Sequence, residues 1–162
     1  LGTFKYNTVH MFHMKIDKKD MKIIEVLKEH GEYTSRQISK KTIFPLTTVH
    51  NRIKKLREHG IIKKYTIKLD NKKLDKNLAA YILVSADYKI LKNKNRTQHQ
   101  LAKEIKKLSE VERADVMTGD IDIIIFARTT NMEEMDKFLL EKLQNIIGID
   151  KTKTLMILHE SD

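Results

Sequence analysis

The sequence contains no cysteine and no tryptophan, and it has one proline and 5 glycines among 162 residues. Without cysteine the chain has no disulfide and no thiolate ligand for a metal, so we expect it to work in a reducing cytoplasm. No apolar run is long enough to span a membrane, and Ile123–Ala127, for example, is only as long as one strand. Residues 1–13 lack the apolar core and the cleavage site of a secretory signal, so we expect none.

The residues that catalysis usually requires are also missing. No glycine-rich loop is available to hold a phosphate, the histidines are scattered, and no acidic residue adjoins His50 as a partner. The pair Asp120 and Asp122 supplies only two carboxylates, which is an incomplete cation site. We therefore expect no enzyme activity, no cofactor and no metal.

Positive charge is concentrated in one part of the chain. Residues 15–76 hold 18 Lys and Arg against 8 Asp and Glu, whereas residues 77–162 hold 13 against 14. The first part therefore carries the net charge of +10 of the whole chain. Basic charge confined to one domain is typical of proteins that bind a polyanion, most often nucleic acid.

Three helices are predicted in the basic part. The first begins at Asp17 as N-cap and ends at Gly31, and the second begins with the capping box Thr34–Gln37 and ends before Pro45. The third runs from Thr47 or Thr48 to His59, with one apolar face and one polar face. Two short helices, a tight turn and a polar third helix indicate a helix-turn-helix. The β-rich segment 61–69 that follows lies where a wing hairpin would be.

The second half predicts a different kind of domain. Strands are expected at 80–87, 111–118, 121–128 and 149–159, with helices at 97–108 and after Asn131. This β-α-β-β-α-β order is that of a ferredoxin-like domain, in which both helices lie on one face of the sheet. Tyr81 and Leu83 share a parity on one strand, as Ile123 and Ile125 do on another, so we expect an apolar second face that a dimer would cover.

The chain therefore belongs to the α+β class, with an N-terminal winged helix-turn-helix followed by a ferredoxin-like βαββαβ domain. The expected boundaries are an extension at 1–14, which shows no periodicity, the DNA-binding domain at 15–69, a hinge at 70–78, and the ferredoxin-like dimerisation domain at 79–162.

Four motifs in this order resemble the Lrp/AsnC (leucine-responsive, feast/famine) family of transcriptional regulators, over roughly Met14 to Glu160. They are Ile16-Asp17-x-x-Asp20-x-x-Ile23-Ile24, Thr47-Thr48-Val49-x-x-Arg52-Ile53-Lys54-Lys55-Leu56-x-x-x-Gly60-Ile61-Ile62, Thr118-Gly119-x-x-Asp122 and Gly148-Ile149-x-x-Thr152-x-Thr154. The resemblance implies transcriptional control through double-stranded DNA, a dimer made through the C-terminal sheets, and in many members an octamer. It also implies an amino-acid effector near Gly119 and contact with the transcription machinery.

The candidate site residues fall into three groups. The N-terminal half of a recognition helix reads base edges, which assigns that role to Thr48, His50, Asn51 and Lys54. Phosphate contacts position the protein without reading sequence, and we assign them to Ser35, Arg36, Arg52, Lys55 and Lys63. A glycine turn beside carboxylates is suited to the two charged ends of an amino acid, which assigns an effector loop to Thr118, Gly119, Asp120 and Asp122.

Two other functions compete with sequence-specific regulation. An architectural or RNA-binding protein would coat nucleic acid without sequence preference, although the basic part has only Tyr33, Phe44 and Tyr65 as aromatic residues for base stacking. A metabolite-binding module that regulates an enzyme would use the second half alone, and it would leave the basic charge unexplained.

Overall fold

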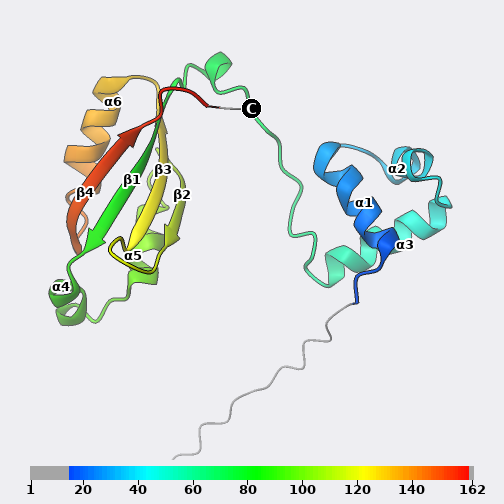
Figure 1. Ribbon diagram of the computed structural model, residues 1–162, viewed down its shortest axis with the longest axis horizontal. Coiled ribbons are helices and arrows are strands. Elements are labelled where there is room, and N and C mark those ends of the chain that lie inside the picture. Colours follow the sequence, from blue (N-terminus) through cyan, green and yellow to red (C-terminus); the bar gives the residue numbers. More distant parts are fainter. Residues whose placement is uncertain (1–14, 161–162) are drawn as a thin grey trace, which may run out of the picture. The chain divides into compact units, whose positions relative to one another are not determined.

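The structure, a computed structural model, describes residues 15–160, so the extension at 1–14 lies outside the described residues. The chain divides between Lys68 and Leu69 into two compact units, here called the N-terminal and the C-terminal unit (Figure 1). No helix of the described residues is long and apolar enough to cross a membrane.

The N-terminal unit consists of three helices, α1 (Lys18–Glu29), α2 (Ser35–Thr42) and α3 (Leu46–Glu58). Side chains close the first two helices at their start. Asp17 accepts hydrogen bonds from two backbone N–H groups of α1, and Thr34 forms the capping box of α2 that the sequence predicts. The core between the helices is small, and its fully or nearly fully buried apolar residues are Ile23, Val26, Ile38, Val49 and Leu56. Each such side chain contributes about 1.5–3 kcal/mol when it is buried.

The turn between α2 and α3 differs from the prediction. The third helix begins at Leu46, one or two residues earlier than expected, because Pro45 serves as its N-cap and no side chain caps it. Ile43 ends α2 in the left-handed conformation, with φ of 62°, and its side chain is 89% exposed. A β-branched residue is strained in this conformation, which glycine adopts freely.

The expected wing strands are absent from the described structure. Residues 61–70 leave α3 without forming a strand, and Tyr65, Ile67 and Leu69 are exposed. The physical reason is that a strand needs a neighbour for its backbone hydrogen bonds. No other strand of the described chain pairs with this segment, since the four-stranded sheet is built from later residues.

The C-terminal unit is a four-stranded antiparallel sheet with helices on one face (Figure 1). The strand order β2-β3-β1-β4 is that of the predicted ferredoxin-like arrangement. The elements in chain order are η1 (Lys72–Leu74), β1 (Leu78–Ala86), α4 (Tyr88–Asn93), α5 (Gln98–Ile105), β2 (Val111–Val116), β3 (Ile123–Thr129), α6 (Met132–Lys137), η2 (Phe138–Leu143) and β4 (Ile149–Met156). The short helix α4 is not predicted from the sequence, and the last predicted helix is α6 continued by one π-helical segment, η2.

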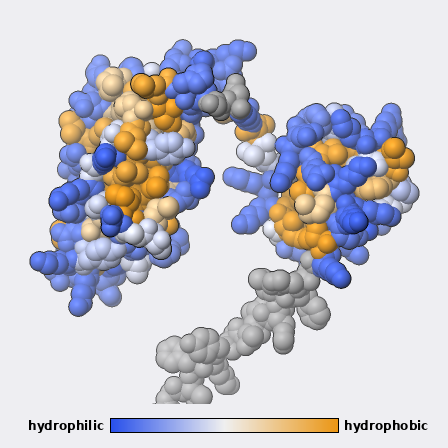
Figure 2. All heavy atoms as spheres, viewed as in Figure 1, coloured by the Kyte–Doolittle hydropathy of each residue, from blue (hydrophilic) through white to orange (hydrophobic). Residues whose placement is uncertain are grey.

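One part of the sheet prediction is wrong. Ile123 and Ile125 do not belong to the open face, because β3 pairs with β1 in a register that sets Ile125 opposite Ile82, and all three are buried under the helices. The open face instead carries the alternate residues Tyr81, Leu83, Ile124, Phe126 and Leu155. Figure 2 shows an apolar stripe on the C-terminal unit. Tyr81 and Leu155 are 47% and 44% exposed, and the Tyr81 and Phe126 rings lie 5.1 Å apart.

Candidate DNA-binding surface and effector loop

The polar face of α3 is the candidate surface for reading bases. His50 and Asn51 are exposed on one turn of the helix and Lys54 on the next, while Thr48 is half-buried at the flank of this face. Lys54 makes only a loose ion pair with Glu58, 3.8 Å long and open to solvent, so its ammonium is available to a ligand.

Four of the five residues assigned to phosphates lie on the surface of the N-terminal unit. Arg36, Lys55 and Lys63 are exposed, and Ser35 is half-buried as the first residue of α2. Their side chains can reach a polyanion.

Arg52 has a different environment from the other basic residues. Its Nη1 lies 2.7 Å from Oδ1 of Asp20 and 2.8 Å from Oδ2 of Asp17, and Asp20 is only 1% exposed. The hydrogen bonds that Arg52 donates to Asp20 and Asp17 raise the pKa of Arg52. The pKa of Asp17 is lowered, first by the backbone N–H of Asp20 and then by Arg52. The guanidinium thus joins the start of α1 to the middle of α3. The number and sign of the charges in the sequence do not predict this contact.

The loop at 118–122 connects β2 to β3. Thr118, Gly119 and Asp120 are exposed, and Gly119 has φ of 104°, which favours glycine. Asp122 is different, because it is buried at 9% exposure and its carboxylate already has partners. The loop therefore offers exposed backbone at its tip and a buried carboxylate at its base.

The hydrogen-bond partners of Asp122 are residues that the sequence analysis did not assign to a functional site. Oδ2 accepts the backbone N–H of Ala86 at 2.7 Å, and Oδ1 accepts the hydroxyl of Tyr88 and the side-chain amide of Gln98. The hydrogen bond to Asp122 raises the pKa of Tyr88. Tyr88 belongs to α4, the helix that was not predicted, so no signal in the sequence placed it beside the loop.

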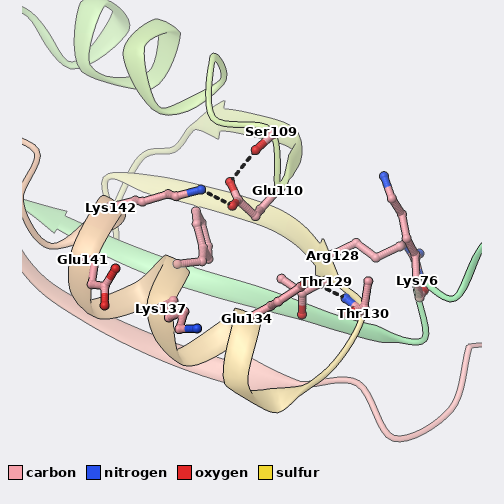
Figure 3. Close-up of a pocket in the computed structure, with 11 residues that line it drawn as sticks. Lys76, Ser109, Glu110, Arg128, Thr129, Thr130, Glu134, Lys137, Glu141 and Lys142 are labelled. Carbon is pink, nitrogen blue, oxygen red and sulfur yellow. Dashed lines mark hydrogen bonds and ion pairs between the residues drawn. The ribbon is translucent and has the colours of Figure 1, made fainter.

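A cavity of about 390 Å³ lies at the other end of β3, between that strand, the start of β2 and the helical segment α6–η2 (Figure 3). Its charges are largely paired within the chain. Lys142 reaches across to Glu110 at 2.5 Å, as Figure 3 shows, and Lys137 pairs with Glu133. Burial raises the pKa of Glu110, but hydrogen bonds from Lys142, its own backbone and Ser109 outweigh burial and leave the pKa below its ordinary value.

No group of three or more His, Cys, Asp or Glu side chains suited to a metal ion occurs among residues 15–160.

Comparison with known proteins identifies the family. Residues 16–63 match the model of a winged helix-turn-helix DNA-binding domain, and residues 80–161 match that of the Lrp/AsnC ligand binding domain. The second match spans more than half of the chain. The chain belongs to the Lrp/AsnC family. Like its named relatives, this Lrp/AsnC protein is a DNA-binding transcriptional regulator.

Individual Lrp/AsnC relatives agree in sequence and in structure. An uncharacterised HTH-type transcriptional regulator of Pyrococcus furiosus is 37% identical over 87% of this chain and 91% of its own length. A transcriptional regulator of Neisseria meningitidis, solved as a complex with L-Met, has a TM-score of 0.82 at 26% identity and covers 91% of this chain and 93% of its own. AsnC of E. coli has a TM-score of 0.77 at 25% identity, with coverage of 90% and 94%. The Lrp/AsnC assignment confirms the family and the fold class expected from the sequence motifs.

Proposed function

We propose that this regulator reads DNA sequence with α3 and binds a two-fold symmetric site as a dimer. The observation that carries the proposal is the exposed polar face of α3, on a unit whose surface is strongly basic. His50, Asn51 and Lys54 contact base edges on this face, with Thr48 at its flank. An asparagine can hydrogen-bond adenine through two atoms, and a lysine can donate to guanine.

The phosphate contacts come from Ser35, Arg36, Lys55 and Lys63. They position α3 in the major groove and make the affinity depend on salt. Arg52 is left out of this set because two carboxylates of its own chain occupy its guanidinium.

The variants Asn51→Ala and Lys55→Ala distinguish recognition of bases from contacts with the phosphates. We expect Asn51→Ala to cost about 1–3 kcal/mol on a preferred site and little on random DNA. Lys55→Ala should weaken both and lower the salt dependence by about one phosphate contact. The preferred site would be found by footprinting DNA upstream of the protein's own gene with random DNA as competitor. Equal losses on both DNAs for Asn51→Ala, or uniform coating with no footprint, would favour an architectural protein.

The dimer forms through the open face of the C-terminal sheet. An apolar face of this kind is covered by a partner in most soluble proteins, and a second copy presents the same face. We expect Tyr81→Glu to yield monomers in sedimentation and to weaken DNA binding, because two half-sites are then no longer bound together. Lys103→Glu, at an exposed position of α5, is the matched control that should leave the dimer intact. A dimer that survives Tyr81→Glu would refute this interface.

An amino-acid effector binds at the loop Thr118, Gly119, Asp120 and Asp122. The support is the exposed glycine turn beside a buried carboxylate, together with the L-Met complex of the Neisseria relative. Calorimetry with each of the 20 amino acids tests this part, with Gly119→Val as the variant expected to lose binding. No heat of binding with any amino acid would refute it.

A further inference from the structure

Both oxygens of the Asp122 carboxylate accept hydrogen bonds from donors of the same chain, and Oδ1 accepts two of them. Oδ2 accepts the N–H of Ala86 at 2.7 Å. Oδ1 accepts two donors, the hydroxyl of Tyr88 and Nε2 of Gln98, the latter at 2.6 Å. A carboxylate oxygen has about two lone-pair sites. A third donor can therefore reach Oδ1 only when one of the two present donors leaves it.

Gln98 is the donor that can be exchanged. It is the first residue of α5, its side chain is half-buried, and its amide is uncharged. The amide and an ammonium group both donate to an ionised acceptor, but only the ammonium adds the attraction between opposite charges. Tyr88 is the first residue of the short helix α4, and its hydroxyl donates to Asp122 while it accepts a second hydrogen bond from Nε2 of Gln98.

We propose that the Gln98 amide occupies the position on Oδ1 of Asp122 that the ammonium group of an amino-acid effector takes. Gln98 is thus a built-in competitor that sets effector affinity, and Tyr88 is the residue that keeps the carboxylate in place. The exposed backbone of residues 118–120 then faces the effector's carboxylate. This inference rests on the proposed effector loop.

The test compares Gln98→Ala with the unaltered full-length protein by calorimetry. The probes are L-methionine, the other 19 encoded amino acids, and the 2-hydroxy acid analogue of any amino acid that binds. We expect Gln98→Ala to bind the amino acid about 10-fold more tightly, the lower end of the effect of one hydrogen bond to a charged acceptor. The hydroxy acid should gain nothing, because it has no ammonium group to replace the amide. His99→Ala, the exposed next residue of α5, is the matched control and should not alter affinity.

A second variant and a direct observation support the comparison. Gln98→Met keeps the length of the side chain without its donors, and it should show the same gain if Gln98→Ala fails to fold. In the unaltered protein the ¹⁵N side-chain resonance of Gln98 should shift and exchange faster with solvent when the effector is added.

The outcomes separate this inference from the proposed function. Tighter binding of amino acids only, including binding that appears in the variant alone, supports the inference. Unchanged or weaker binding, or an equal gain for the hydroxy acid, overturns the role of Gln98 and leaves the effector loop standing. Failure of every amino acid to bind either protein overturns both.

Discussion

Replacing Arg52 with methionine removes the cation that pairs with Asp17, the N-cap of α1, and with Asp20 in its first turn, while a long apolar side chain remains in its place. Asp20 is 1% exposed, so it would be left as a buried charge with no cation. Removing one member of a fully buried pair costs about 3–5 kcal/mol. Half of the Asp17 side chain is exposed, and its contact contributes little. We therefore expect the N-terminal unit to lose about 2–4 kcal/mol.

Two measurements follow this change, and both use the full-length protein. Hydrogen exchange reports on each unit separately, and the amides of α1 and α3 should exchange faster in Arg52→Met while those of the C-terminal sheet do not change. DNA affinity measured over a range of salt concentrations reports phosphate contacts, because each contact adds about 0.9 to the slope of log K against log salt. We expect Arg52→Met to lower affinity with the slope unchanged, whereas Lys55→Ala lowers the slope by about 0.9.

The opposite result would support the prediction from the sequence that Arg52 contacts a DNA phosphate. A slope that falls by about 0.9 in Arg52→Met, with hydrogen exchange unchanged, would make Arg52 a phosphate contact. The double variant Arg52→Met with Asp20→Asn adds a control, since it removes the buried charge together with its partner. It should recover part of the stability lost in the single variant, because no unpaired carboxylate remains.

Three further changes test the backbone and the charge pairs. Ile43→Gly should raise the thermal midpoint of the N-terminal unit, with a gain of up to about 1 kcal/mol, because it relieves a left-handed β-branched residue. Gly148→Ala should cost at least about 2 kcal/mol in denaturant unfolding, since its Cβ would lie 2.6 Å from Leu91, whereas Gly119→Ala, which meets no atom within 4 Å, should cost about 1 kcal/mol through strain alone. The hydrogen bond from Arg128 lowers the pKa of Glu160 below its ordinary value of 4.5. The ion pair therefore stabilises the fold above pH 4.5, and this stabilisation is lost as the pH falls through the lowered pKa. Unfolding curves below pH 5 should therefore show a weaker pH dependence in Glu160→Gln, and an identical dependence would contradict the pairing.

Local signals in the sequence placed most of the elements correctly. The capping residues Asp17, Thr34 and Asn131 act on N–H groups two or three residues away, so their effect can be read from the chain alone. The buried stripe of α3 follows in the same way from the 3.6-residue period, and Val49 and Leu56 are indeed fully buried.

Contacts between residues far apart in the chain could not be predicted from local sequence patterns. The two partners of Arg52 lie 35 and 32 residues away, and those of Asp122 lie 24 to 36 residues away. From composition alone, such groups are expected to be surface charges. In the structure they instead form ion pairs and hydrogen bonds within the chain. The residues that surround a functional loop are therefore the part of a site that sequence patterns miss first, as Tyr88 and Gln98 show.

The open face of the sheet shows why parity on a strand was insufficient. Residues 123–126 of β3 are all apolar, so the period of two gives no preference for either face, and only pairing with β1 decides which residues are buried. A strand that is apolar on both faces is typical of a sheet covered on both sides. The helices α5 and α6 cover one side only, which leaves Ile124 and Phe126 on the other. The apolar residues on both faces of β3, which led to the wrong assignment of Ile123 and Ile125, are therefore consistent with the proposal that a second copy covers this face.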